Sequence, residues 1–482
     1  MRNQIVFYLN GKRHNVAGEQ AGMMLADYLR YDQALTGTKV VCAEGDCGAC
    51  SVLRYFPHVS GTDADNYIAI NSCITPVATL DASSLLTVES LKDGERLHEA
   101  QRSMVDSHGS QCGFCTPGFV MALTGLVEEK LSKKQKAISD KEAKNCLTGN
   151  LCRCTGYQAI IDAATKVDLK KEKTLKDRYY DSEQESALKD VYAKSVLVET
   201  PKFSFFAPKT MVEAVAYLDK NPDTRIIASS TDLGVVHNKR KINLTKLLSL
   251  HLVDELYQIE STDKVRLGAR VTMTEFRHFI KDKVPDIANY IDIFASPQIK
   301  NIATIVGNIA NASPIGDTPP VFLALGANVL LHGKNGKRSL AISEFFLDYR
   351  KTARASDEII TGLEFDLPGK NTSFKAFKNS NRKDLDISAM NMVIQVDWQD
   401  DKKEVVKDIR IAAGGIAAIP LRLKKTEDAL RGQKIDQKLL EKICKDVHQE
   451  FTPLSDLRAS SAYRRVLVEN YLMRFFKQEV LA

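Results

Sequence analysis

Alternating apolar and polar positions near the N-terminus predict a small β-sheet. The strand-like segments are residues 5–9, 13–16, 51–55 and 67–70. Asn10-Gly11 separates the first two segments, and this dipeptide between two strands is typical of a tight hairpin turn. Apolar residues recur at helical spacing over residues 23–29. Residues 1–88 are therefore predicted to form a small α+β domain.

The pattern changes to helical spacing over residues 89–166, which are predicted to form a second domain. One apolar face runs along residues 119–127. Thr116-Pro117 precedes it and is a favourable helix start, with Thr as N-cap and Pro as the first helical residue. The spacing therefore predicts a long helix that begins at this dipeptide.

Three further segments complete the predicted organisation. Residues 167–196 are charged, contain no Gly or Pro and have weak periodicity, which indicates a linker that is at most partly helical. Residues 197–370 contain an amphipathic helix at 211–218 and a strand from residue 225, and they are predicted to form an α+β domain. Residues 371–482 are predicted to form a C-terminal α+β domain.

Composition agrees with a multidomain globular protein. A chain of 482 residues is too long for one core. The net charge of +6 is small and dispersed, which does not favour a nucleic-acid partner. No apolar run approaches the roughly 20 residues that a membrane span needs, and the first residues are too polar for a secretory signal. We therefore expect a cytoplasmic protein without a membrane partner, whose cysteines are more often metal ligands than disulfides.

The first candidate metal site is the loop Cys42-Ala-Glu-Gly-Asp-Cys47-Gly-Ala-Cys50, followed by Cys73. Four thiolates hold a 2Fe–2S cluster, and the C-x4-C-x2-C…C spacing is that of plant-type ferredoxins. With the surrounding hairpin, helix and strands it predicts a ferredoxin-like β-grasp domain. The alternatives are a zinc site or buried free thiols, although zinc loops favour paired C-x2-C units.

A second cysteine group lies in the helical region. Its members are Cys112, Cys115, Cys152 and Cys154. Each pair precedes a helical pattern, where the helix dipole favours the negative charge of thiolates and a cluster. The group predicts a second 2Fe–2S cluster, with zinc as the alternative because C-x2-C with a second pair is also a zinc pattern. Cys146 and Cys444 lie outside both groups and are interpreted as plain buried thiols.

Two stretches rich in small polar residues are candidates for binding a phosphorylated ligand. Residues 225–234 pass from a strand into a Ser/Thr-rich turn, whose backbone N–H groups could surround a pyrophosphate. This signal is weak alone, and no G-x-G-x-x-G supports a Rossmann site. Residues 301–320 are almost uncharged and rich in Asn, Ser and Thr, as expected of a loop that contacts a large planar ligand.

The cysteine motifs resemble those of the molybdenum hydroxylases, the family of xanthine dehydrogenase, aldehyde oxidase and the carbon monoxide dehydrogenases. The resemblance is carried by Gln111-Cys-Gly-Phe-Cys115-Thr-Pro-Gly and Leu151-Cys-Arg-Cys154-Thr-Gly-Tyr. It implies two 2Fe–2S clusters in this chain, the second beside a molybdopterin, with Gln111 contacting the pterin.

The same resemblance implies a flavin domain, followed by a C-terminal domain of the same flavoproteins. The residues implied to contact FAD are Ile226, Ile227, Ala228, Ser229, Ser230, Thr231, Asp232, Leu233, Phe294, Thr304, Ile305, Val306, Gly307, Asn308 and Asp317. Arg382, Asp386 and Ser388 are implied to lie at the flavin edge, although a surface ion pair is an equal interpretation of Arg382 and Asp386. Two positions depart from the family pattern: Val306 replaces a usual Gly, and Asn311 a frequent Thr.

The order of clusters and FAD on one chain is most similar to the small subunits of bacterial xanthine dehydrogenases. That resemblance implies an electron-transfer subunit with no acid–base catalyst of its own. Electrons would come from purine oxidation at a molybdopterin-binding large subunit, pass through the two clusters to FAD, and reach NAD. A heterotetramer of two small and two large subunits is expected. The alternative is the equivalent subunit of a hydroxylase that acts on aldehydes or N-heterocycles.

Overall fold

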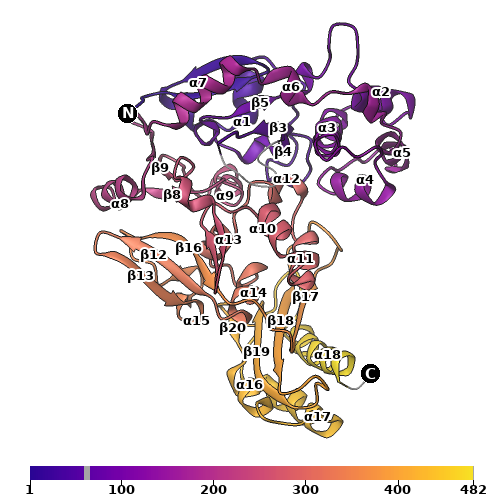
Figure 1. The fold of residues 1–482 in the computed structure, drawn as a ribbon, viewed down its shortest axis with the longest axis vertical. Helices are drawn as coiled ribbons and strands as arrows, with labels where there is room; N and C mark the ends of the chain where they lie inside the picture. Colours follow the sequence, from indigo (N-terminus) through magenta and orange to yellow (C-terminus); the bar gives the residue numbers. More distant parts are fainter. Residues whose placement is uncertain (59–65, 481–482) are drawn as a thin grey trace. The chain divides into compact units, whose positions relative to one another are not determined.

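The computed structural model describes residues 1–58 and 66–480, which divide into two compact units. Unit 1 comprises Met1–Asp254, Thr272–Glu275 and Ser296–Ala303, and unit 2 comprises Glu255–Val271, Phe276–Ala295 and Thr304–Ala482. The protein is a multidomain α+β chain, as predicted (Figure 1). Across the described ranges, no helix is both long and apolar enough to span a bilayer. The domain boundaries proposed from the sequence remain predictions.

Unit 1 begins with a five-stranded sheet in the order β2-β1-β5-β3-β4. Its strands are β1 (Ile5–Leu9), β2 (Lys12–Val16), β3 (Ser51–Tyr55), β4 (Ile68–Asn71) and β5 (Ser84–Leu86). The hairpin prediction is confirmed: Asn10 and Gly11 have φ of 52° and 78°, the left-handed values that a type I′ turn requires. The helical stretch predicted over residues 23–29 begins later and ends later, as α1 (Leu25–Asp27) continued by a π-type turn over Tyr28–Asp32.

A helical region follows the first sheet. It contains α2 (Glu99–Asp106), α3 (Thr116–Ser132), α4 (Asp140–Leu147) and α5 (Gln158–Thr165). Helix α3 is buried over most of its length and packs against β3 and β4 (Figure 1). Its N-cap is Cys115, one residue before the predicted cap, because the hydroxyl of Thr116 pairs with Ser110 instead.

The predicted linker is partly helical, as its sequence allows. It contains α6 (Leu175–Tyr179) and α7 (Ser182–Tyr192). The carboxylate of Glu128 on α3 accepts the N–H of Leu175, and the Arg178 guanidinium donates to the carbonyl of Leu91. These polar contacts act together with apolar ones, because Leu175, Leu188 and Val191 are buried.

The rest of unit 1 contains a four-stranded sheet in the order β6-β7-β9-β8. Two helices lie between its strands, and a third comes from a later part of the chain. Its elements are β6 (Val196–Glu199), β7 (Ser204–Ala207), α8 (Met211–Lys220), β8 (Arg225–Ile227), α9 (Leu233–Asn238) and β9 (Lys246–Ser249). Helix α12 (Pro297–Lys300) comes much later in the chain but belongs to unit 1, where it packs against β4. Helix α10 (Met273–Ile280) begins in unit 1 and ends in unit 2.

Unit 2 contains a five-stranded sheet in the order β10-β11-β16-β12-β13. Its strands are β10 (Ile259–Ser261), β11 (Val265–Gly268), β12 (Asn328–Gly333), β13 (Gly336–Ala341) and β16 (Ile359–Phe365). The associated elements are α11 (Pro285–Asp292), α13 (Ile305–Ala310), α14 (Thr318–Ala324), α15 (Ile342–Phe345), β14 (Phe346–Asp348) and β15 (Lys351–Thr352).

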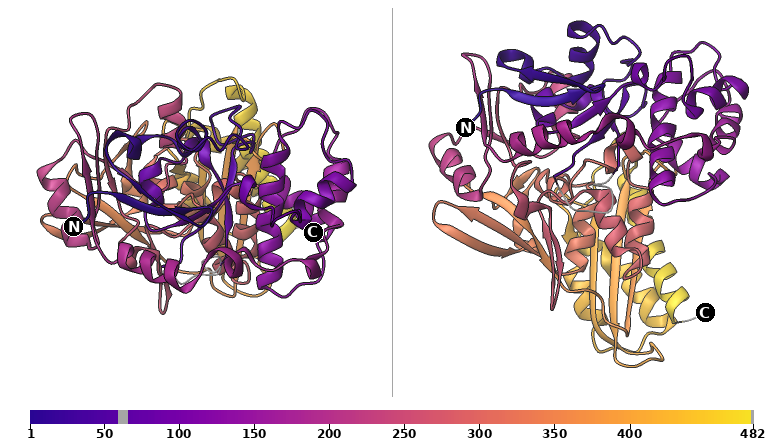
Figure 2. Two further views of the ribbon diagram at one scale, coloured as in Figure 1. Left: turned by 90° about the horizontal axis from the view of Figure 1, so that it is seen from above. Right: turned by 45° about the horizontal axis from the view of Figure 1, so that its top comes forward.

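A four-stranded antiparallel sheet, in the order β17-β18-β19-β20, carries the C-terminal part of unit 2. Its elements are β17 (Thr372–Asn379), β18 (Met390–Trp398), β19 (Val406–Gly414), β20 (Leu421–Arg422), α16 (Lys424–Leu430), α17 (Gln437–Asp446) and α18 (Ser461–Glu479). The even-numbered apolar residues of β18 form one core with α18, which lies along the sheet (Figures 1 and 2). Asn391 is on the opposite face and bonds to Gly316 beside α14, so alternation in β18 separates an apolar side from a polar one.

Candidate cofactor sites

The structure brings the first four cysteines together in unit 1. Cys42 is partly exposed, whereas Cys47, Cys50 and Cys73 are buried. The thiol of Cys42 contacts those of Cys47 and Cys73, and Cys73 contacts Cys50. Backbone N–H groups of Glu44 and Cys47 also point at the Cys42 sulfur, each 3.4 Å away. Contacts from the other thiols, together with these amides, lower the pKa of Cys42 well below its usual range.

The second cysteine group is also assembled, at the N-terminal ends of α3 and α5. Cys112 and Cys154 are exposed with their sulfurs 3.6 Å apart, and the thiol of Cys115 contacts that of the buried Cys152. Burial opposes ionisation of Cys152, but the hydroxyl of Thr155 and nearby amides outweigh it and lower the pKa of this thiol to about 7.

Both groups suit the predicted clusters. A 2Fe–2S cluster uses two thiolates at each of its irons, and in the second group the thiols meet as two pairs. The amide and hydroxyl donors around Cys42 and Cys152 are of the kind that stabilise metal-bound thiolates.

The two cysteine loops touch each other. The N–H of Leu151, next to Cys152, donates to the carbonyl of Cys47 at 3.0 Å. A Cβ at Gly118 would lie 2.3 Å from the carbonyl oxygen of Gly48. Only glycine allows this approach, so the spacing between the two candidate cluster sites depends on backbone contact.

The predicted pyrophosphate loop lies in unit 1, between β8 and α9. Ser229 and Ser230 are buried, and Ser230 has a left-handed φ of 70°. Within the described ranges, its buried hydroxyl has no hydrogen-bond partner, which suits a loop that binds phosphate oxygens. At the far end of α9, the side-chain amide of Asn238 donates to the carbonyls of Ala43 and Cys73, each at 2.8 Å. Helix α9 therefore connects this loop with the first cysteine site.

The second predicted flavin segment lies in unit 2. Thr304 caps α13 by accepting the N–H of Gly307 at 3.0 Å. The side chains of Ile305 and Val306 are buried, so only their backbone is suited to contact a cofactor. The side-chain oxygen of Asn308 accepts the hydroxyl of Thr318 at 2.6 Å. Phe294, also in unit 2, is half-buried.

Asp317 is the centre of a buried polar cluster in unit 2. One carboxylate oxygen accepts from Tyr290 (3.1 Å), Ser388 (2.6 Å) and Asn391 (3.2 Å), and the other accepts from the Lys378 ammonium at 2.7 Å. Burial, and then the charge of Asp317, raise the pKa of Tyr290 well above its usual range. Lys378, Tyr290 and Asn391 were not predicted, because nothing in their local sequence distinguishes them from ordinary strand or helix residues.

Arg382 and Asp386 are outside this cluster. Their charged groups are 3.8 Å apart in an exposed turn, where Arg382 also donates its N–H to Asp386 and its guanidinium to the carbonyl of Leu385. A pair of this kind is worth about 0–1 kcal/mol. Of the three residues implied at the flavin edge, only Ser388 joins Asp317. Gln111 is exposed beside Cys112, and its predicted pterin contact remains a prediction.

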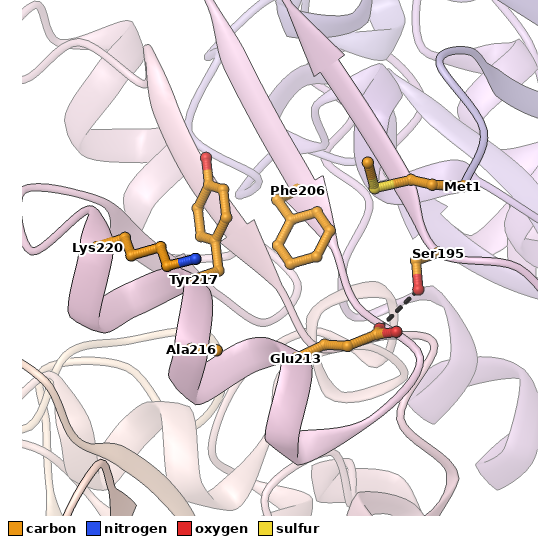
Figure 3. Close-up of a pocket in the computed structure, with 7 residues that line it drawn as sticks. All are labelled: Met1, Ser195, Phe206, Glu213, Ala216, Tyr217 and Lys220. Atoms are coloured by element: carbon orange, nitrogen blue, oxygen red, sulfur yellow. Dashed lines mark hydrogen bonds between the residues drawn. The ribbon is translucent and has the colours of Figure 1, made fainter.

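A separate groove of about 360 Å³ lies over β7 and α8. Figure 3 shows it lined by Met1, Phe206 and Tyr217, with Glu213 accepting the hydroxyl of Ser195 at 2.7 Å. No residue predicted to contact a cofactor lines this groove.

Comparisons with known families match four successive segments of the chain. Residues 7–78 match the 2Fe-2S iron-sulfur cluster binding domain, and residues 87–165 match the [2Fe-2S] binding domain. Residues 201–368 match the FAD binding domain in molybdopterin dehydrogenase, and residues 375–479 match the CO dehydrogenase flavoprotein C-terminal domain. The chain therefore carries two 2Fe-2S domains, an FAD binding domain and a flavoprotein C-terminal domain.

Similar proteins include xanthine dehydrogenases, CO dehydrogenases and a quinoline 2-oxidoreductase. Xanthine dehydrogenase 1 of Arabidopsis thaliana is 28% identical over 544 residues, which cover 98% of this chain and 39% of that protein. The chain thus spans about two fifths of the curated relatives it matches. A structure of CO dehydrogenase from Oligotropha carboxidovorans has a TM-score of 0.53 and 25% identity, covering 57% of this chain and 97% of that chain. A structure of quinoline 2-oxidoreductase from Pseudomonas putida 86 has 23% identity and a TM-score of 0.53, and it covers 59% of this chain and 99% of that chain. It shows that the fold is shared.

Proposed function

We propose that this chain is the electron-transfer subunit of a xanthine dehydrogenase. It would pass electrons from purine oxidation at a molybdopterin-binding large subunit, through two 2Fe–2S clusters and FAD, to NAD. The observation that carries the proposal is the assembly of two four-cysteine groups on a chain that also holds an FAD-binding domain. A complex of two small and two large subunits is part of the proposal.

The chain's own residues bind and tune these groups. When bound, a 2Fe–2S cluster carries single electrons, and a flavin exchanges a hydride as well as single electrons. Cys42, Cys47, Cys50 and Cys73 would hold one cluster, and Cys112, Cys115, Cys152 and Cys154 the other. Hydrogen bonds to the sulfurs favour the thiolate form that iron requires. The unpartnered hydroxyl of Ser230 would donate to the FAD pyrophosphate.

The choice of xanthine rests on the curated relatives, and a second candidate rests on the structures. The first relatives are xanthine dehydrogenases that match 98% of this chain. The similar folds include CO dehydrogenase and quinoline 2-oxidoreductase, which favour the alternative of a subunit serving another molybdenum hydroxylase, acting on aldehydes or N-heterocycles.

An anaerobic visible spectrum of the purified protein, before and after addition of NADH, tests the cofactors and the acceptor together. We expect flavin and iron–sulfur absorption that bleaches with NADH. Absorption that persists unchanged with NADH would contradict NAD as acceptor, and a protein that stays colourless after reconstitution would overturn the cofactor assignment.

Substrate choice is tested on the complex purified from its native host. We expect xanthine and hypoxanthine to bleach the iron–sulfur absorption anaerobically. Bleaching by quinoline or an aldehyde, without a response to xanthine, would replace the xanthine proposal by the alternative.

A further inference from the structure

Gln298 is a buried polar residue between the two cysteine loops of unit 1. It lies on α12, and its side chain is fully buried. In the sequence it is four residues after Phe294 and six before Thr304, both predicted flavin residues. It is not one of the residues to which the sequence assigned a role.

The side-chain amide of Gln298 closes a ring of hydrogen bonds. Its Nε2 donates to the Asn150 side-chain oxygen at 2.8 Å and to the Ser51 hydroxyl at 3.2 Å. Asn150 then donates to the carbonyl of Gly48 at 3.1 Å, and Ser51 donates to the same carbonyl at 2.7 Å. The amide of Gln298 is thus linked to the carbonyl of Gly48 by two hydrogen-bonded routes, one through Asn150 and one through Ser51.

The members of this ring come from the two candidate cluster loops. Gly48 lies between the ligands Cys47 and Cys50, and Ser51 follows Cys50 directly. Asn150 lies two residues before Cys152. Ser51 and Asn150 are each only 2% exposed, so water does not compete for these bonds.

The packing around Gln298 leaves no spare room. A Cβ at Gly149 would lie 2.0 Å from its Oε1, and a Cβ at Gly48 would lie 2.2 Å from the carbonyl oxygen of Gly149. The Gln298 side chain therefore packs closely against the backbone of the second cysteine loop at Gly149. That backbone in turn packs closely against Gly48 of the first loop.

We propose that Gln298 is a positioning residue that holds the two cysteine loops at one distance and orientation, and so sets the coupling between the two clusters. This inference rests on the proposed function, because it assumes that both clusters are bound. Glutamine suits the role because its planar amide supplies two donors from one atom, whereas a carboxylate supplies none and a protonated carboxyl supplies one.

The test compares Gln298→Glu with Gln184→Glu in the full chain. Gln184, on α7, is also buried and donates to a serine hydroxyl, that of Ser84 at 2.8 Å, but it contacts neither cysteine loop. The measurement is the electron paramagnetic resonance spectrum of the fully reduced protein. Its splitting depends on the distance and orientation of the two paramagnetic clusters. Iron content and melting temperature are measured in parallel.

We expect Gln298→Glu to retain the iron of both clusters and to change or lose the splitting, while Gln184→Glu keeps the wild-type spectrum. An unchanged splitting in Gln298→Glu with full iron content would overturn the proposal, even if the melting temperature falls. A wild-type protein without iron would instead reject the proposed function.

If Gln298→Glu does not fold, Asn150→Asp provides the second variant. It replaces the donor to Gly48 by an acceptor oxygen and keeps the acceptor for Gln298. We expect a smaller change in the splitting, and a wild-type splitting in this variant would also overturn the proposal.

Discussion

Lys378 and Asp317 form a buried ion pair within a wider polar cluster. Their side chains are 1% and 8% exposed, and the ammonium also donates to the hydroxyl of Ser388 at 3.0 Å. Removal of one partner leaves an uncompensated buried charge, whose cost is typically about 3–5 kcal/mol. The stability of unit 2 should therefore depend strongly on each partner of this pair.

We expect Lys378→Met to lower the free energy of unfolding of unit 2 by about 3–5 kcal/mol. Urea unfolding can be followed by Trp398, the single tryptophan of the chain, which is buried in β18. Lys375→Met is the matched control, because Lys375 lies on the same strand and forms a half-exposed pair with Asp286, worth about 0–1 kcal/mol. Equal losses in the two variants would contradict the argument.

At the level of elements, short helices connect the cofactor segments. Helix α9 begins at Leu233, the last residue of the predicted pyrophosphate loop that is implied to contact FAD. It ends at Asn238, whose side chain donates to the carbonyls of Ala43 and Cys73. Helix α6 is held by the buried carboxyl of Glu128. In each case a hydrogen bond made by one side chain helps to fix the position of a helix: Asn238 for α9 and Glu128 for α6.

We expect Asn238→Asp to lose iron from the first cluster selectively. The substitution replaces a donor by an acceptor that faces two carbonyl oxygens, at a cost of about 1–3 kcal/mol. Iron analysis and paramagnetic resonance measure the effect. Asn221→Asp is the control, since Asn221 also donates to a carbonyl, that of Tyr217 at 3.0 Å, at the end of α8. Full iron content in Asn238→Asp would refute the prediction.

Glu128 makes the stability of unit 1 depend on pH. Burial raises the pKa of its carboxyl to about 8 from its ordinary value of 4.5, while the hydrogen bond from the N–H of Leu175 acts to lower this pKa. Because the folded state holds the proton more tightly, the stabilisation is complete below pH 4.5 and is lost as pH rises towards 8. The loss is at most about 1.4 kcal/mol per pH unit.

We therefore expect Glu128→Gln, which imitates the protonated form, to flatten the fall in melting temperature between pH 5 and pH 8. The neighbouring Glu129 is half-exposed and pairs with Lys133, so Glu129→Gln should retain the wild-type pH profile. The same slope in wild type and Glu128→Gln would show that another group is responsible.

At the level of the whole molecule, ten cysteines divide into eight candidate ligands and two others. Cys146 donates to the carbonyl of Ala122 at 3.3 Å, and burial raises the pKa of its thiol to about 12. Burial likewise raises the pKa of Cys444 to about 11. Cys444 is buried, as predicted, whereas Cys146 is partly exposed; the raised pKa of each thiol favours its neutral form.

We expect Cys42→Ser and Cys152→Ser each to remove one cluster and to stop electron flow from xanthine to NAD in the assembled complex. Cys146→Ser should retain both clusters and full turnover. The measurements are iron content and anaerobic reduction by substrate. Full turnover in Cys42→Ser would contradict the proposed route.

The sequence by itself determined the features that depend on neighbouring residues. The Asn10-Gly11 hairpin, the strand over residues 51–55 and the cysteine spacings are local patterns, and the structure confirms the hairpin and the strand. The sequence allowed a partly helical linker but did not place the helices α6 and α7 within it. The predicted flavin contacts remain predictions.

Only the tertiary structure decided the polar contacts between segments far apart in the chain. Lys378 meets Asp317 across 61 positions, Gln298 meets Asn150 across 148, and Asn238 meets Cys73 across 165. No local pattern marks these residues, because their roles arise from the partners that folding brings to them and from the exclusion of water around the resulting bonds.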